Sequence, residues 1–164
     1  MDLIKSFPDH TNYNIEAEIV AINEFLKKSN LNVDPIFFTK VEKGDILEIY
    51  RFPENTQSFS NSEFRRLCSY SDEQMKTIPF PKLFWREDEV NLSVMRRSAT
   101  VCNVENKLSQ WGLGSHDLVE SLHPKRRTFS INLKWISPCY PDGETKAVAF
   151  ISTCCVEFIY ELPE

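Results

Sequence analysis

Apolar residues recur with the spacing of an α-helix near the start of the chain. Ile15, Ile19, Ile22 and Leu26 fall at positions i, i+4, i+7 and i+11, so they form one stripe. Asn14 precedes this stripe as an N-cap, and acidic residues in the first turns with lysines in the last suit the helix dipole. The pattern predicts an amphipathic helix that follows a polar arm and ends near residue 29.

The last part of the chain has the pattern of two long strands. Residues 128–136 alternate between apolar and polar positions, whereas residues 147–160 are apolar with little alternation. The second segment therefore predicts a central strand that is covered on both faces, and the turn residues 141–144 predict an antiparallel connection. The residues of the first strand that we expect to share one face are Phe129, Ile131, Leu133 and Trp135.

Between these regions the pattern is broken into short elements. Residues 36–41 and 46–50 are strand-like and flank a turn, so they predict a hairpin, and the polar segment 52–60 predicts a loop. Short helices are expected over residues 61–68, 71–75, 87–95 and 115–122, the second of them with a capping box between Ser71 and Gln74. This order of elements predicts an α+β fold with an antiparallel sheet.

Composition narrows the class of protein. The 164 residues carry 19 Lys and Arg against 24 Asp and Glu, a net charge of −5, so we expect no direct nucleic-acid binding. With 41% hydrophobic residues the chain can fill a core, and no apolar run reaches the ~20 residues that span a bilayer. The first residues lack the pattern of a secretory signal. These features predict a cytoplasmic protein that does not bind membranes.

The cysteine content also favours a cytoplasmic location. Five is an odd number, in a chain too large to need disulfides for its stability. No Cys-x-x-Cys pair and no histidine at ligand spacing is present, so no metal site is predicted. Cys154 and Cys155 are adjacent in a strand and should point to opposite faces. We expect reduced, buried thiols.

Several local strings resemble the PAS domain family. Ser60-Asn61-Ser62-Glu63-Phe64 with Leu67, followed by residues 69–75 (Ser-Tyr-Ser-Asp-Glu-Gln-Met), is similar to the run found in the helix cluster of that family. Residues 133–138 and 142–144 resemble the final hairpin, and residues 147–151 the last strand. A second register is also open, because Asn103, Leu108 and residues 114–119 before His123-Pro124 are similar to the same run. The resemblance covers residues 33–160.

The resemblance implies a fold and a function. The expected fold is a PAS-like antiparallel sheet of about five strands, with short helices on one face and an N-terminal amphipathic flanking helix. It divides the chain into an arm with flanking helix (residues 1–32) and a single domain (residues 33–164). The function implied is a non-catalytic sensory or regulatory module that binds a small apolar ligand, a protein partner or both, and that signals through dimerisation.

Two groups of residues carry this hypothesis. The helix stripe is the candidate contact with a second copy or another regulatory protein, the alternative being that it covers its own core. The other group would line a ligand cavity between the sheet and the helices. The candidate cavity residues are Phe64, Leu67, Met75, Leu92, Met95, Leu133, Trp135 and Phe150.

The chemistry-bearing residues leave two interpretations open. Some PAS sensors hold haem through a histidine ahead of the long strands, so His116 is the candidate cofactor ligand, although we expect no cofactor. The alternative is a small α+β enzyme, a hydrolase or isomerase with a cavity on a curved sheet. An enzyme predicts that His116 and an acidic residue face the cavity together, whereas a binding module predicts an apolar cavity wall without convergent polar groups.

Overall fold

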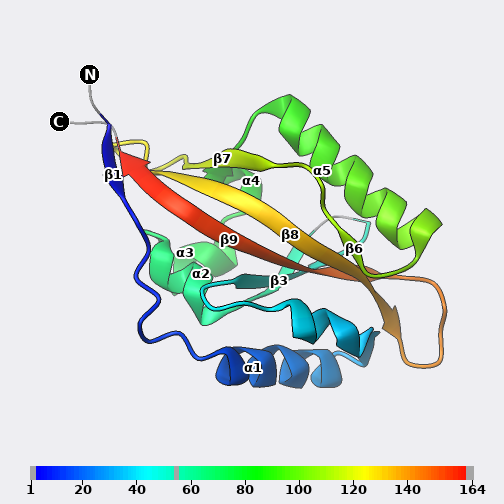
Figure 1. The fold of residues 1–164 in the computed structure, drawn as a ribbon. Coiled ribbons are helices and arrows are strands. Elements are labelled where there is room, and N and C mark those ends of the chain that lie inside the picture. Colours follow the sequence, from blue (N-terminus) through cyan, green and yellow to red (C-terminus); the bar gives the residue numbers. More distant parts are fainter. Residues whose placement is uncertain (1–2, 54–55, 162–164) are drawn as a thin grey trace.

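The computed structural model describes residues 3–53 and 56–161, and its centre is a curled antiparallel sheet (Figure 1). Within the described residues the sheet has nine strands, six of which follow the order β4-β3-β9-β8-β7-β5. Three short strands pair outside this path, β1 with β9 and both β2 and β6 with β8. The strands are β1 (Ile4–Ser6), β2 (Leu31–Val33), β3 (Ile46–Arg51), β4 (Thr56–Ser60), β5 (Phe84–Trp85), β6 (Ser109–Gln110), β7 (Ser115–Glu120), β8 (Thr128–Pro141) and β9 (Ala149–Glu161).

The predicted fold class is therefore wrong. Instead of a PAS-like sheet of about five strands, the described chain has a nine-stranded sheet that curls into a half-barrel, with few and short helices. The extra strands β1, β2, β5 and β6 are two or three residues long, so none of them leaves a periodic pattern in the sequence. Pairing with the long strands β7, β8 and β9 is what makes these short segments extended.

One face of the sheet is covered by the N-terminal helix. Helix α1 (Ile15–Lys28) confirms the predicted helix, and the Asn14 side chain caps it by accepting a hydrogen bond from the Ala17 N–H at 3.1 Å. Beside it lies η1 (Pro35–Lys40), a 3-10 helix where the sequence predicts a strand. Asp34 caps η1, and Phe37 is fully buried from it. The local Asp-Pro start thus overrides the strand-like composition of residues 36–41.

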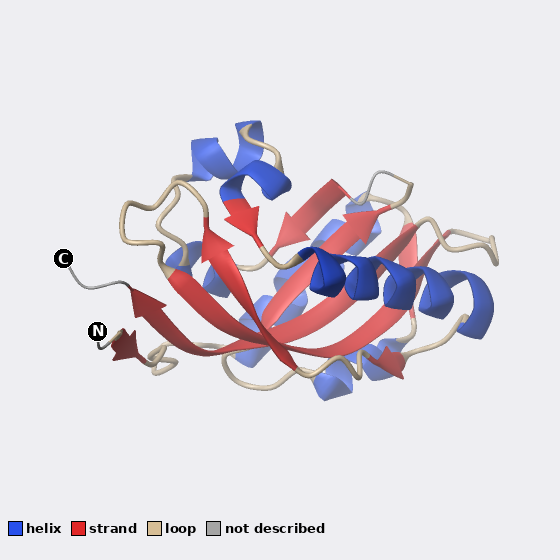
Figure 2. Cartoon of the chain, turned by 90° about the horizontal axis from the view of Figure 1, so that it is seen from above, coloured by secondary structure: helices blue, strands red, loops and turns tan. Residues whose placement is uncertain are grey.

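The opposite face carries the remaining helices. These are α2 (Ser62–Leu67), α3 (Asp72–Thr77), α4 (Phe80–Leu83), α5 (Asp88–Thr100) and the π-helical turn η2 (Val101–Glu105). The predicted capping box of Ser71 and Gln74 is present at the start of α3. Seen from above, α5 crosses over the sheet (Figure 2). The helices before α5 pack on a core around Phe129 and Cys154, and the end of α5 with η2 packs on a core around Ile136 and Phe150.

Two further predictions fail for the same physical reason. The sequence predicts a loop over residues 52–60, which contain β4, and a helix over residues 115–122, which contain β7. Both segments are polar, and both form ladders with a neighbour of strong strand character, β4 with β3 and β7 with β8. Hydrogen bonding to the neighbour decides their conformation, as is common for strands at or near a sheet edge.

A bulge in β8 separates residues that the alternation places together. Leu133 pairs with Cys154 and Trp135 with Thr153, so Lys134 is an extra residue in the strand. Phe129 and Ile131 keep the predicted common face and Leu133 packs against the same core. Trp135 instead packs on the α1 side with the core around Ile22 and Leu26. The prediction of one shared face is therefore wrong for Trp135.

The bulged residue forms a buried ion pair with the turn before β3. Lys134 Nζ lies 2.7 and 2.9 Å from the two carboxylate oxygens of Asp45, which is 1% exposed, and 2.8 Å from Glu42 Oε1. The Asp45 carbonyl accepts hydrogen bonds from Tyr13 Oη at 2.6 Å and Asn61 Nδ2 at 3.0 Å. The turn is thus fixed to β8, to α2 and to the N-terminal arm at once.

The turn also receives the arm at Gly44. Its φ is +90°, and a Cβ there would lie 2.6 to 2.7 Å from the His10 ring. We expect Gly44→Ala to cost about 1–2 kcal/mol of stability from the backbone conformation. Displacing the His10 ring from its rotamer adds about 1 kcal/mol. Urea unfolding of the variant measures the sum of these two losses in the free energy of unfolding.

Gly143→Ala is the matched control. Gly143 has a φ of +74°, and a Cβ added there would meet nothing within 4 Å, so this variant should show only the backbone cost. In a His10→Ala background the two alanine variants should lose similar stability. Equal losses in the wild-type background would contradict the contact between His10 and Gly44.

Candidate ligand-binding cavity

A cavity of about 280 Å³ lies between α5 and the sheet. Its wall is mainly apolar, with α5 on one side, β3, β8 and β9 on the other, and α4 and Trp111 at the ends. Asn91 and Met95 are exposed, so the mouth of the cavity lies along α5. The apolar lining residues are Phe80, Pro81, Val94, Met95, Trp111, Leu133 and Phe150, and the polar ones include Glu48, Tyr50, Arg86, Ser98 and Ser152.

The alternation of β3 places one carboxylate in this cavity. Leu47 and Ile49 point toward α1 and are fully buried there, so Glu48 and Tyr50 point to the opposite face. Glu48 is 8% exposed and accepts hydrogen bonds on Oε2 from Tyr50 Oη and, at 2.7 Å, from Gln57 Nε2. Its Oε1 accepts only a long contact, 3.5 Å, from the Cys154 thiol. A buried carboxylate held by donors of this kind is a stable element of the wall.

The donors to Glu48 stay protonated. Burial, together with the nearby Glu48 charge, raises the pKa of the Tyr50 phenol and of the Cys154 thiol well above their usual values. Both groups therefore keep their protons at neutral pH and can donate to Glu48. The pKa of each of the other cysteines, Cys68, Cys102, Cys139 and Cys155, is also raised, in each case mainly by burial. All five thiols are free.

Aromatic rings build one end of the cavity. Phe150 stacks on Tyr50 with ring centroids 5.3 Å apart and meets Trp111 edge to face at 5.9 Å. The Trp111 indole N–H donates to Ser152 Oγ at 2.9 Å, so the polar edge of this ring is satisfied within the protein. Ser98 Oγ donates to the Met95 carbonyl at 2.9 Å. Neither hydroxyl is hydrogen-bonded to a base.

Arg86 is the cationic group of the cavity wall. It lies directly after β5 and is partly buried. Among the described residues it makes no hydrogen bond and no ion pair, although it lies close enough to Tyr50 and His116 for its charge to affect their pKa values. The guanidinium donors are thus available, whereas Glu48 is engaged.

His116 lies elsewhere. It is on β7 and lines a larger hollow of about 510 Å³ at the β5–β7 edge of the sheet, together with exposed Trp85 and Asp117. Burial, and secondarily the charge of Arg86, lowers the pKa of His116 to about 4, against the opposing effect of Asp117. Neither ring nitrogen has a hydrogen-bond partner among the described residues. His116 therefore lies outside the cavity under α5, and the acidic residues that share its own hollow are Glu87 and Asp117.

The candidate cavity residues lie in four different places. Met95, Leu133 and Phe150 line the cavity. Phe64 and Leu67 are buried in the adjacent core, Met75 packs against that core, Leu92 is 45% exposed on α5, and Trp135 lies on the other face of the sheet. Sequence reasoning misses Glu48, Tyr50, Arg86 and Trp111. For Glu48 a signal exists, because it is the one charged residue in the strand predicted over residues 46–50.

The candidate dimer stripe packs on its own sheet. Ile22 and Leu26 are 0% and 3% exposed in the core of the α1 face, and Ile15 and Ile19 pack against the same core. Val20, outside the stripe, is the large apolar residue of α1 that is exposed, at 55%. In the structure the stripe therefore covers the core of its own chain, as the alternative interpretation predicts.

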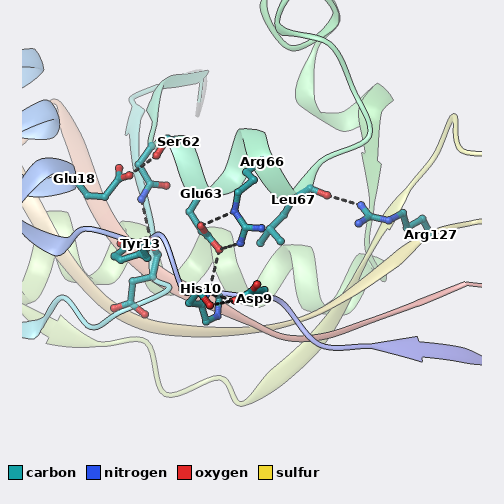
Figure 3. Close-up of polar contacts among 12 residues, drawn as sticks. Asp9, His10, Tyr13, Glu18, Ser62, Glu63, Arg66, Leu67 and Arg127 are labelled. Carbon is teal, nitrogen blue, oxygen red and sulfur yellow. Dashed lines mark hydrogen bonds and ion pairs between the residues drawn. The ribbon is translucent and has the colours of Figure 1, made fainter.

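Figure 3 shows how the N-terminal arm attaches next to α1 and α2. Glu63 is 4% exposed; its carboxylate lies 3.0 Å from His10 Nδ1 and accepts hydrogen bonds from Arg66 at 2.6 and 3.2 Å. Ser62 is hydrogen-bonded to Glu18 of α1. The described part of the arm is held in place by these contacts and by the pairing of β1 with β9.

The chain matches no protein-family model, and no curated protein matches it in sequence. The resemblance to the PAS family therefore stays a prediction. Within the described ranges, no three Cys, His, Asp or Glu side chains gather closely enough to hold a metal ion, and no helix combines the length and apolar character needed to cross a membrane.

The buried His116 predicts a pH dependence. Its folded pKa of about 4 lies below the ordinary 6.5, so protons bind the unfolded chain preferentially between these values. Its contribution to stability is complete above pH 6.5 and is lost as the pH falls toward 4. Allowing for solvent screening, we expect a loss of the order of 1–2 kcal/mol from this residue.

Carboxylates also titrate in this range, so His116→Gln is the control. Chemical unfolding of both proteins at pH 7 and pH 4.5 should show a smaller decrease for the variant. The same decrease in both would contradict the low pKa of His116.

Proposed function

We propose that this protein is a non-catalytic regulatory module that binds a small, largely apolar ligand between α5 and the sheet. The observation that supports the proposal is the 280 Å³ cavity with its aromatic and aliphatic wall. Ligand pockets are typically lined by apolar side chains, with a few polar groups that fix orientation, and this cavity lies just below the usual range of about 300–1,000 Å³. The ligand is accordingly small.

Binding is favoured over catalysis by the state of the polar groups. The two serine hydroxyls of the wall, Ser98 and Ser152, are hydrogen-bonded to a carbonyl and to an indole rather than to a base. The Cys154 thiol is held protonated, and His116 lines a different hollow. A nucleophile needs a neighbouring base or a lowered pKa. Glu48 is the one carboxylate of the described wall, and the pKa values of its partners, the Tyr50 phenol and the Cys154 thiol, are raised rather than lowered, so neither partner is activated as a nucleophile.

Strand β3 suggests how occupancy would be signalled. Glu48 and Tyr50 face the cavity while Leu47 and Ile49 contact α1, so the same strand borders both the ligand and the N-terminal helix. A ligand that fits one position of β3 better would shift its packing against α1, by no more than its differential affinity for the two arrangements. The proposal includes a second copy or another regulatory protein as the recipient. The five free thiols support a reducing, cytoplasmic location.

A co-purifying ligand is the first test. Native mass spectrometry of the freshly purified protein, repeated after denaturation and accompanied by an absorption spectrum, should show a small molecule that is released on unfolding. Leu133→Trp fills the cavity from β8 and should abolish the adduct. Leu92→Trp adds the same bulk on the exposed side of α5 and should leave the adduct unchanged.

The outcome against the proposal is equally defined. An adduct that survives in Leu133→Trp is bound elsewhere. If no adduct is found, and if 3-phenylpropionate, 3-phenylpropanol and 3-phenylpropylamine all fail to bind, the cavity is not a ligand site.

Signalling through dimerisation requires its own measurement. Light scattering coupled to size-exclusion chromatography should give twice the mass of one chain. Because Ile22 and Leu26 are already buried in the monomer, the contact has to use exposed residues, and Val20→Glu on α1 should shift the mass toward one chain if α1 takes part. A single-chain mass for the wild-type protein would contradict dimerisation.

A further inference from the structure

We propose that the ligand of this cavity carries a carboxylate, or an equivalent small anion, that binds Arg86. The inference rests on the proposed function and specifies the chemistry of the ligand. It begins from an imbalance between the two charged groups of the wall, Glu48 and Arg86. One of them is engaged by the protein and the other is not.

Glu48 is the engaged group. Tyr50 and Gln57 donate to one of its oxygens, and the Cys154 thiol approaches the other at 3.5 Å. These donors come from β3, β4 and β9, so the carboxylate is fixed by three strands. A ligand is not needed to satisfy it.

Arg86 has donors without acceptors. No described residue accepts a hydrogen bond from it or forms an ion pair with it, although it is partly buried and lines the cavity. A guanidinium presents five N–H donors in a planar fork that matches a carboxylate in a two-bond arrangement. The nearby His116 does not compete with it or replace it, because its lowered pKa keeps the imidazole neutral at pH 7.

The rest of the wall defines the body of the ligand. Phe80, Phe150 and Trp111 present aromatic surface, and Val94 and Leu133 present aliphatic surface. An anion with an apolar body therefore places its head at Arg86 and its body among these side chains. This describes a small amphipathic carboxylate.

Three probes with the same phenylpropyl body and different head groups test whether the cavity prefers a carboxylate. Isothermal titration calorimetry at pH 7.5 compares 3-phenylpropionate, 3-phenylpropanol and 3-phenylpropylamine, which differ in the charge of the head group. We expect the acid to bind about 10- to 100-fold more tightly than the alcohol, the range that charge-assisted hydrogen bonds provide. The amine should bind most weakly.

Variants assign the selectivity to Arg86. Arg86→Gln should reduce binding of the acid to the level of the alcohol while leaving binding of the alcohol unchanged, which also shows that the cavity is intact. Arg96→Gln removes the same charge from the exposed surface of α5, outside the cavity, and should leave the preference for the acid unchanged.

The failures are distinguishable. Equal binding of acid and alcohol, or tightest binding of the amine, overturns the carboxylate inference while the cavity remains a ligand site. An equal effect of Arg96→Gln also overturns it, because the preference would then reflect overall charge. Binding of none of the three probes overturns the inference together with the proposed function.

Discussion

Strand β9 lies between β8 on one side and β3 and β1 on the other, and the other elements depend on this double pairing. The ladder with β8 runs from Thr128 to Cys139 and is interrupted by register shifts that let the two long strands twist and curl together. Because the sheet curls, its two faces differ. One is closed by α1 and η1, and the other is spanned by α5 above a cavity.

The bulge at Lys134 connects the curl of the sheet to the placement of charge. It directs the lysine amine to Asp45, which burial would otherwise make unfavourable as a carboxylate, and it turns Trp135 toward α1. Without the bulge, the Trp135 side chain would lie on the cavity side of β8; with the bulge it lies on the α1 side. Leu133 remains on the cavity side as the aliphatic wall, so the same irregularity stabilises the turn before β3 and leaves room for a ligand.

The parts of the structure that the sequence predicts well are those in which local pattern and burial agree. The stripe of α1, the capping box at Ser71 and the largely apolar run of β9 each match their observed element. Strand β7 could not be predicted in this way, since its conformation is set by hydrogen bonds to β8 rather than by periodicity. The face of Trp135 depends on a single inserted residue, which alternation cannot reveal. Arg86 precedes three acidic residues and so resembles a solvated helix start; only the tertiary structure places it at the cavity.

The burial of the cysteines has a chemical consequence. The thiolate, rather than the thiol, reacts with disulfides and oxidants, and burial raises the pKa of all five thiols in this protein. A chain with five unpaired cysteines is therefore slow to exchange disulfides or to cross-link, and the core that contains Cys154 keeps its packing when the surroundings become more oxidising. Protection here is kinetic and comes from packing alone.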